Sequence, residues 1–297
     1  MCLVATFSLW SHIDFPSSEP FISGDTFKKH SDFSLDQCSD FDPLDVQYGD
    51  IIFVNAAFLS DFFEKKHPFI REGYVLITHE HVRSVPGKFA SYLDDPHLLA
   101  WFGKNAFDVA HPKLFCIPLG LTSQRAKNGR WRAHGKIEVL KKCIERGPSI
   151  GKKHLLYQNY SLNTHPSRKK TFKQIEKMSL PFLFQRKKRV NYEQYLLDTL
   201  KSDFVISPRG RSMDCHRIWE ALYLGTIPIV KHSPLDCLLK DLPILFVDDW
   251  SEISQEFLER KKKEILSKKY NLEKIYFSYW KQKINEYKLP SLIRQET

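Results

Sequence analysis

The charged residues best suited to chemistry follow a predicted strand over 203–207. A turn over 208–211 comes next, and a helix is expected over 214–224 with Asp214 as its N-cap. In doubly wound α/β folds, phosphates bind where the carboxyl end of a parallel strand leads into a helix, because unpaired N–H groups and the helix dipole point outward there. The pattern therefore indicates an anion site at this turn.

Three arginines and a glutamate could serve such a site. Arg209, Arg211 and Arg217 would add fixed positive charge beside a bound diphosphate, and Glu220 could accept hydrogen bonds from ribose hydroxyls. A simpler interpretation is that Arg217 and Glu220 form an i, i+3 surface ion pair worth roughly a few tenths of a kcal/mol, while the loop arginines are solvated. The spacing alone leaves both interpretations open.

The elements that would position these residues form two α/β halves, because 297 residues suffice for about two domains. After an opening region, 1–48, in which we expect a strand and loops, apolar runs over 51–54, 74–78 and 114–120 are typical of strands buried on both faces. The pattern restarts at 154 with a succession of strands and helices whose right-handed crossovers predict a Rossmann-like lobe.

Charge narrows the class of partner. The chain has 45 Lys and Arg against 35 Asp and Glu, a net charge of +10 that favours anionic partners. The basic tracts over 186–189 and 261–263 raise nucleic-acid binding as one hypothesis. A charge run on a helix is usually a solvated face, however, and no recognition-helix pattern accompanies either tract.

Cysteine content and hydropathy bear on the compartment. The six cysteines lack zinc-ligand spacing and indicate reduced, mostly buried thiols. No run approaches the roughly 20 apolar residues of a membrane span. We therefore expect a soluble, cytoplasmic protein. The Asp-x-Asp motif over 40–42 follows no apolar strand, so we do not expect it to hold a metal ion.

The segment over 207–253, SPRGRSMDCHRIWEALYLGTIPIVKHSPLDCLLKDLPILFVDDWSEI, resembles the C-terminal signature of exostosin-like glycosyltransferases. Weaker motifs look like parts of soluble bacterial and viral members of that family; they lie at 76–81, 92–105, 111–121 and 155–169. The resemblance implies an α/β protein of GT-B type. Two Rossmann-like lobes would face one another across a cleft, with a C-terminal helix packing back across the lobes.

The resemblance also implies a role for each part of the chain. Residues 1–150 would form the acceptor-side lobe, 151–265 the lobe that binds a nucleotide sugar, and 266–297 the crossing helix. Of the implied donor-binding residues, three would contact the diphosphate, one the ribose, and two would shape the pocket; they are, in that order, Arg168, Arg209 and Arg217, then Glu220, then Asp214 and His216.

Glycosyl transfer requires a neutralised leaving diphosphate and a deprotonated acceptor hydroxyl. The resemblance assigns the first task to Arg or Lys and helix dipoles, so no metal and no cofactor are expected. For the second task we predict His79, Glu80 or His81, because they follow a buried strand, although each could instead be a hydrogen-bonded structural residue. Asp61 is a weaker rival, and Asn105 either binds substrate or caps a turn.

The expected activity is an inverting transfer from a nucleoside-diphosphate sugar, UDP-linked, to a hydroxyl of a glycan, polysaccharide or glycolipid. A glycolipid acceptor would bring peripheral contact with a membrane, and no nucleic-acid partner is expected. The alternative is a catalytically inactive protein of the same fold that binds a sugar nucleotide or a glycan. Mutation of the three candidate bases separates the two hypotheses, because only an enzyme would lose turnover while retaining its donor.

Overall fold

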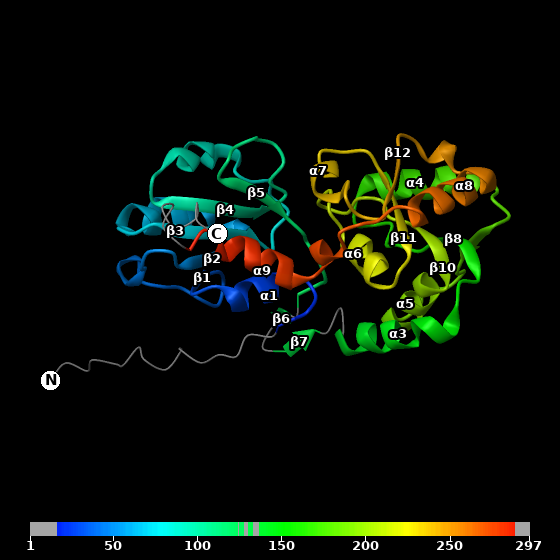
Figure 1. The fold of residues 1–297 in the computed structure, drawn as a ribbon, viewed down its shortest axis with the longest axis horizontal. Helices are drawn as coiled ribbons and strands as arrows, with labels where there is room; N and C mark the ends of the chain where they lie inside the picture. The colour runs from blue at the N-terminus through cyan, green and yellow to red at the C-terminus, as the bar shows by residue number, and fades with distance from the viewer. Residues whose placement is uncertain (1–16, 124, 128–129, 133–136, 289–297) are drawn as a thin grey trace.

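The computed structural model describes residues 17–123, 125–127, 130–132 and 137–288, and it shows two α/β lobes side by side (Figure 1). The first lobe contains a parallel sheet in the order β1-β2-β3-β4-β5. These strands are β1 (Phe33–Leu35), β2 (Ile51–Asn55), β3 (Tyr74–His79), β4 (Leu98–Lys104) and β5 (Leu114–Ile117). A short antiparallel hairpin, β6 (Arg125–Lys127) and β7 (Arg130–Arg132), follows.

The second lobe contains another parallel sheet, in the order β12-β11-β10-β8-β9. Its strands are β8 (His154–Gln158), β9 (Leu183–Gln185), β10 (Ser202–Ile206), β11 (Ile227–Lys231) and β12 (Leu245–Val247). The predicted fold class, two parallel-sheet α/β lobes facing one another, is confirmed.

Strand order distinguishes the two lobes. The second sheet grows in both directions from β8, with β9 on one side and β10 on the other, so the loops after β8 and β10 diverge at a switch point. The first sheet follows the sequence order without such a reversal. Because ligands of open α/β sheets bind at the carboxyl end of a switch point, the topology favours the second lobe as the ligand-binding one.

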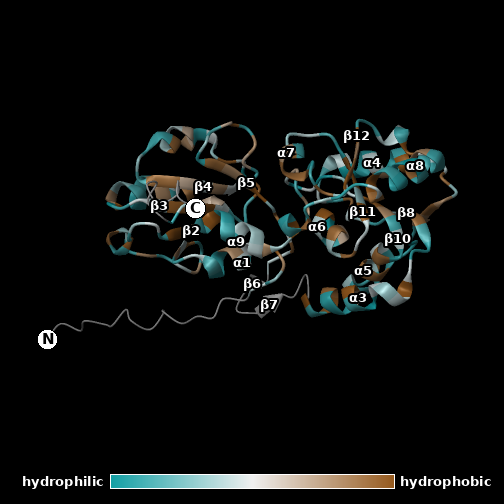
Figure 2. Cartoon of the chain, in the orientation of Figure 1, coloured by the Kyte–Doolittle hydropathy of each residue, from teal (hydrophilic) through white to brown (hydrophobic). Residues whose placement is uncertain are grey.

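Both faces of the first sheet are buried, which explains its continuous apolar strands. One face carries Ile52 and packs against helical turns that contain Phe62 and Phe89. On the other face, Phe53 packs among residues of α1 (Gly24–His30) and α9 (Phe277–Asn285). Figure 2 shows β3 and β4 in the brown of hydrophobic residues. The short α2 (Leu59–Asp61) belongs to the first set of turns.

Six helices accompany the second sheet within the described residues. They are α3 (Ile137–Ile150), α4 (Pro166–Lys177), α5 (Tyr192–Leu200), α6 (His216–Tyr223), α7 (Asp236–Leu239) and α8 (Gln255–Leu266). Helices α4 and α8 contribute Ile175 and Leu258 to the core on one face, and α5 and α6 contribute Leu196 and Trp219 to the core on the other.

Besides β4, which was not predicted, the structure differs from the sequence-based elements in three places. Helix α1 lies within 1–48, where we expected a strand and loops, because Ser23 caps it by accepting a hydrogen bond from the Thr26 N–H. Helix α3, inside the range predicted for the first lobe, packs against α5 of the second. Within the crossing helix predicted over 266–297, the described residues form a short turn at Leu272–Ile275 before α9 begins at Phe277.

The C-terminal segment returns to the first lobe, as the fold prediction requires. Tyr223 of α6 donates a hydrogen bond to the Ile275 carbonyl at 2.7 Å, and α9 then buries Phe277 and Ile284 beside Phe27 of α1 (Figure 1). This route ties the two lobes together on the side where α1 and α9 lie.

The described cysteines do not match the expectation of mostly buried thiols, because only Cys143 and Cys215 are buried. The five described cysteines are free thiols, and Cys38 and Cys237 are exposed rather than buried. Cys2 lies outside the described residues. Across the described part of the chain, we find no helix with the length and hydropathy needed to cross a bilayer.

Candidate functional site

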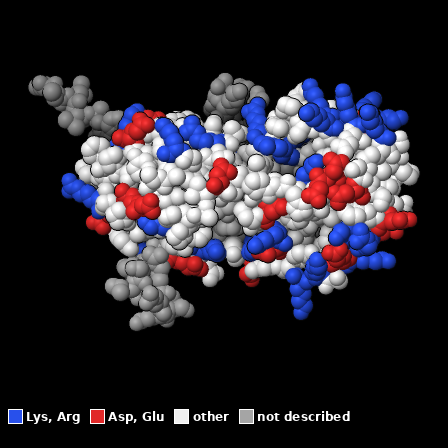
Figure 3. Space-filling model, turned by 90° about the horizontal axis from the view of Figure 1, so that it is seen from above, with Lys and Arg blue, Asp and Glu red and all other residues white. Residues whose placement is uncertain are grey.

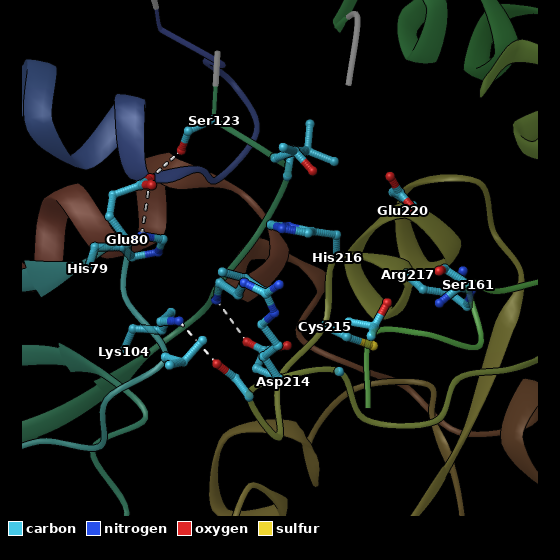
Figure 4. Close-up of a pocket in the computed structure, with 18 of the residues that line it drawn as sticks. His79, Glu80, Lys104, Ser123, Ser161, Asp214, Cys215, His216, Arg217 and Glu220 are labelled. Carbon is cyan, nitrogen blue, oxygen red and sulfur yellow. Dashed lines mark hydrogen bonds and ion pairs between the residues drawn. The ribbon is translucent and has the colours of Figure 1, made fainter. Parts of the chain in front are cut away.

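A cavity of about 720 Å³ lies between the lobes at the carboxyl ends of both sheets. The first lobe contributes the ends of β3 and β4 and the segment over 119–123. The second lobe contributes the loops after β8 and β10, the N-terminus of α6 and two tyrosines of α5 (Figure 4). The cavity therefore opens on the switch point between β8 and β10.

Most of the predicted site residues line this cavity. They are His79, Glu80, His81, Arg168, Asp214, His216, Arg217 and Glu220. In Figure 4, Glu80 and His79 stand on the first-lobe side, opposite Arg217 and Glu220 of the second lobe. Residues that lie more than a hundred positions apart in the sequence thus meet in one pocket.

Arg209 is placed differently from its prediction. Its side chain lines a separate cavity of about 240 Å³, and its guanidinium donates to the carbonyls of Gly210 and Arg211. The Arg209 carbonyl accepts a hydrogen bond from Arg168 Nε at 2.9 Å, so the main chain of Arg209 faces Arg168 while its side chain lies elsewhere. Arg211 lines the interlobe pocket and Arg209 does not, so the contact of Arg209 with a diphosphate stays a prediction that this placement does not favour.

Arg168, near the start of α4, organises the loops of the switch point. Its guanidinium donates to the carbonyls of Ser161, Pro208 and Arg209, at distances from 2.9 to 3.3 Å. Arg168 is 6% exposed, and burial lowers the pKa of its guanidinium. No carboxylate within the described part of the chain forms an ion pair with it. Its charge is therefore held at the pocket without being neutralised.

Arg217, in the first turn of α6, offers a second unneutralised guanidinium. It stacks over the rings of Tyr160 and Tyr195 at 5.6 and 5.5 Å, and its Nε is buried without a hydrogen-bond partner. The alternative i, i+3 ion pair with Glu220 is not formed in the structure of the described residues. A buried polar group without a partner is costly, so this guanidinium is prepared for an anion.

The N-terminus of α6 strengthens the positive field. Cys215, not Asp214 as predicted, is the N-cap, and its side chain makes no capping hydrogen bond. The prediction was wrong because both Asp214 oxygens are occupied: Oδ1 accepts from Trp219 Nε1 and Oδ2 from the Leu119 N–H, at 2.8 and 2.7 Å. The first N–H groups of α6 therefore remain available to an anionic ligand.

Glu220 is held by two phenol groups. Tyr192 donates to Oε1 and Tyr195 donates to Oε2, each at 3.0 Å, and the carboxylate is buried. Each oxygen keeps a second lone pair. The arrangement fixes an acceptor at the pocket wall, one turn beyond Arg217. It suits the predicted hydrogen bond from a ribose hydroxyl.

Asp214 and His216 bridge the lobes. Asp214 binds the Leu119 N–H, and His216 Nδ1 donates to the Gly120 carbonyl at 2.8 Å, so both reach the segment that follows β5. Burial raises the pKa of Asp214 and lowers that of His216. Both residues therefore position the two walls of the pocket as well as lining it.

All three candidate bases line the pocket, and Glu80 is the carboxylate among them. The ring nitrogens of the two histidines are engaged as follows. His79 is 1% exposed and its Nε2 donates to the Pro118 carbonyl at 3.1 Å, whereas Nδ1 lies 3.6 Å from Glu80 Oε1. His81 uses Nδ1 to accept from the Arg83 N–H, so its neutral ring carries the proton on Nε2. The lone pair of such a ring is on Nδ1, where it is already engaged by the Arg83 N–H.

Glu80 itself is held in an unusual conformation. Its φ is 73°, in the left-handed region that costs a glutamate about 1 kcal/mol or more. Ser123 donates a hydrogen bond to Glu80 Oε1 (Figure 4). A Cβ on Gly24 would collide with the same oxygen, so only a glycine permits this placement. Strain of this kind is common at functional sites.

Two weaker candidates are also placed by the structure. Asp61 is half exposed and pairs with Lys65 on the surface, away from the pocket. Asn105, at φ 63°, donates from Nδ2 to Ser212 Oγ of the second lobe at 3.3 Å and to loop carbonyls of the first. Asn105 is therefore an interlobe contact beside the pocket.

Several pocket residues were not predicted from the sequence. Lys104 ends β4, is 5% exposed, and was hidden in an apolar strand that we had not predicted. Burial lowers the pKa of the Lys104 ammonium to about 8. Tyr192 and Tyr195 lie in an ordinary amphipathic helix, where only the structure brings them to Glu220.

The aspartates of the Asp-x-Asp motif over 40–42 form an ion pair and a helix cap. Asp40 pairs with Lys66, and Asp42 caps a short helical turn by accepting from the Leu44 N–H. Among the described residues, no group of three or more His, Cys, Asp or Glu side chains is arranged to hold a metal ion.

The tract over 261–263 is a solvated face, as predicted. Lys261 pairs with Glu264 and Lys262 with Asp203. In the view of Figure 3, Asp and Glu side chains lie among the Lys and Arg of both lobes.

The fold and the pocket define a two-lobed α/β protein that can hold an anionic ligand at the switch point of its second sheet. Residues 162–290 match the family model described as RXYLT1 C-terminal domain. That range contains Arg168, Arg217 and Glu220, so the match coincides with the second-lobe wall of the pocket.

Two curated proteins are similar to part of the chain. Ribitol-5-phosphate xylosyltransferase 1 of Danio rerio is 33% identical over 107 residues, which are 30% of this chain and 24% of that protein. The Homo sapiens protein of the same name is 30% identical over 116 residues, 33% of this chain and 25% of that protein. The similarity thus spans about a quarter of each relative and is to glycosyltransferases. The exostosin resemblance stays a prediction, and neither relative supports a bacterial or viral type.

Solved structures are similar only in outline. The N-terminal domain of Candida albicans trehalose-6-phosphate phosphatase gives a TM-score of 0.41 at 12% identity, covering 82% of this chain and 72% of that one. The pneumococcal O-GlcNAc transferase GtfA, solved with UDP and GlcNAc, gives 0.32 at 10% identity, covering 85% and 56%. Both TM-scores lie below 0.5, so these likenesses carry no further conclusion.

Proposed function

We propose that this protein transfers a sugar from a nucleoside diphosphate to an acceptor hydroxyl in the interlobe pocket. The observation that carries the proposal is the pair of unneutralised guanidinium groups, Arg168 and Arg217, beside the uncapped N-terminus of α6 at the switch point. Such a cluster suits a diphosphate, whose charge it would balance. The similarity of this same segment to a xylosyltransferase domain supports sugar transfer as the reaction class.

The donor would lie along the second lobe. The diphosphate would take the α6 N–H groups and Arg217, and a ribose hydroxyl would donate to Glu220. Arg168 would contribute charge while keeping the loops over 159–164 and 208–211 in place, since its donors are occupied by their carbonyls. Positive charge at the leaving diphosphate is thus supplied by side chains and a helix terminus. We propose on this basis that transfer proceeds without a metal ion.

The acceptor would approach from the first lobe. Glu80 lines the first-lobe side of the pocket, where its carboxylate accepts a hydrogen bond from Ser123 (Figure 4), and it would take the acceptor proton while the anomeric carbon is attacked from that side. His79 Nδ1 lies 3.6 Å from Glu80 Oε1, and the ring would stabilise the carboxylate when both of its nitrogens carry protons. A single in-line displacement between opposed walls inverts the anomeric centre.

The first donor to assay is UDP-linked, and the first sugar to assay is xylose, since the two curated relatives are named ribitol-5-phosphate xylosyltransferase 1. Ribitol-5-phosphate is for the same reason the first acceptor, followed by glycans and glycolipids. The protein would be incubated with UDP, GDP, ADP and CMP sugars while its melting temperature and the release of nucleotide are followed. Stabilisation by one nucleotide class and turnover with its sugar are expected.

One variant separates an enzyme from a binding protein of the same fold. Glu80→Gln is expected to bind the donor as the wild type does and to lose transfer. Equal turnover of Glu80→Gln and wild type would remove Glu80 from the mechanism, and a flat thermal response to all four nucleotide classes would refute the proposed function.

Comparing Arg217→Met with Arg209→Met tests which arginine binds the diphosphate. Arg217→Met is expected to weaken nucleoside-diphosphate binding about 10- to 150-fold, the equivalent of a charged hydrogen bond of roughly 1.5–3 kcal/mol. Arg209→Met is expected to leave the dissociation constant within about threefold, because its guanidinium lies in the other cavity. The reverse ranking would contradict the assigned diphosphate site.

A further inference from the structure

Lys104 is a buried cation that the proposed mechanism has not yet used. It ends β4, a strand whose other residues are apolar, and its side chain lies at the floor of the interlobe pocket (Figure 4). The residue is only 5% exposed. Lysines are almost never buried to this degree unless they are paired.

The Lys104 ammonium is short of partners. Its only hydrogen bond in the described part of the chain is donated to Ser212 Oγ, at 3.3 Å, and no ion pair within 4.0 Å is formed there. The carboxylate that favours its charge is Asp214, whose two oxygens are already occupied by Trp219 Nε1 and the Leu119 N–H. Burial accordingly lowers the pKa of Lys104 to about 8.

The surroundings show what would complete the coordination of this ammonium. Lys104 lies on the first-lobe wall, and the cations of the proposed diphosphate site, Arg168 and Arg217, lie on the second-lobe wall of the same pocket. Its hydrogen-bond partner Ser212 belongs to the loop that leads into α6. An anion bound at the α6 N-terminus and extending toward the first lobe would therefore meet Lys104 at its far end.

We infer that Lys104 is the first-lobe contact of the sugar-bearing phosphate of the donor, and thus a catalytic residue that touches the leaving group. This inference rests on the proposed function. In the transfer, the acceptor oxygen forms a bond to the anomeric carbon and its proton passes to the Glu80 carboxylate. The bond from the anomeric carbon to the phosphate oxygen breaks, and its electron pair stays on that oxygen. Lys104 donates a hydrogen bond to the same oxygen as the charge develops.

The position of Lys104 also couples donor binding to the arrangement of the lobes. One ammonium would bond both to the phosphate and to Ser212, and Asn105 Nδ2 bonds to the same Ser212 hydroxyl at 3.3 Å. A bound diphosphate would therefore connect the end of β4 with the loop before α6.

The test compares Lys104→Met with Lys152→Met, a control lysine whose Nζ bonds to Thr226 Oγ1 at 3.0 Å outside the pocket. Dissociation constants would be measured by calorimetry for the nucleoside monophosphate, the diphosphate and the diphosphate sugar. Lys104→Met is expected to weaken the diphosphate and its sugar about tenfold or more, and the monophosphate by less than about threefold. Lys152→Met is expected to have the dissociation constants of the wild type. Lys104→Arg, which keeps the charge, is expected to lose less affinity for the diphosphate than Lys104→Met.

The outcomes distinguish the inference from the function on which it rests. If the wild type binds no nucleotide, both fail. If the wild type binds and Lys104→Met binds the diphosphate equally well, only the inference fails. A rise in acceptor KM with unchanged donor binding would assign Lys104 to a phosphate on the acceptor instead. An equal loss of affinity for the monophosphate and the diphosphate would place Lys104 at the phosphate attached to the nucleoside. Either result overturns the inference.

Discussion

Lys104→Met should stabilise the protein in the absence of ligand, although it weakens binding. The wild-type ammonium is removed from water and lacks an ion-pair partner among the described residues, so folding disfavours its charged form. Methionine has a similar length and no charge to desolvate. Among the described residues, the hydrogen bond lost with the amine is the one to Ser212, at 3.3 Å.

The size of the effect follows from the lowered pKa. The interval between the ordinary lysine value of 10.5 and about 8 corresponds, at about 1.4 kcal/mol for each pKa unit, to about 3 kcal/mol. The folded pKa lies below the unfolded one, so the full destabilisation is present below pH 8, where both states are charged. It decreases as the pH rises from 8 to 10.5, because the unfolded chain then binds a proton that the folded protein does not.

Urea unfolding of the two proteins at several pH values would check this reasoning. The difference in unfolding free energy between Lys104→Met and wild type should approach about 3 kcal/mol at pH 7 and shrink steadily above pH 8. The groups that face Lys104, namely Asp214, Cys116, His81 and His216, remain in both proteins. A variant less stable than wild type at pH 7, or a difference independent of pH, would refute the account of an unpaired buried charge.

Three further substitutions test the walls of the pocket. Gly24→Ala should displace the Glu80 carboxylate and lower kcat at least tenfold while the nucleotide dissociation constant is unchanged; full activity would show that the placement of Glu80 is unimportant. Tyr195→Phe removes a donor from buried Glu220 and should lower the unfolding free energy by about 1–3 kcal/mol, measured in urea, and an unchanged value would contradict the hydrogen bond. Asp214→Asn turns an amide N–H toward a donor, so thermal unfolding should show a loss of about 1–3 kcal/mol; equal melting temperatures would argue against the bridge between the lobes.

Local patterns were enough to predict much of the second lobe. The apolar runs gave the strands around 154, 203 and 227, and the helix behind the turn gave Arg217 and Glu220 a common face. These features depend on hydrophobic periodicity and on neighbours three or four residues apart, which are written in the chain itself. Helix caps and helix breaks were predicted less well. Asp214 was predicted as the N-cap of α6, but its hydrogen-bond partners are Trp219 and Leu119, and Leu119 belongs to the other lobe.

Sequence alone thus determined two parallel-sheet lobes. It also predicted an anion site at the turn over 208–211 and three candidate bases, His79, Glu80 and His81. Tertiary structure decided which side chains share the pocket. It turned the Arg209 side chain into another cavity, bonded His79 to the Pro118 carbonyl, and brought Lys104 to Ser212 from the other lobe. The physical reason is that side-chain direction at a loop, and the pairing of groups more than a hundred residues apart, depend on how the two lobes pack rather than on any local pattern.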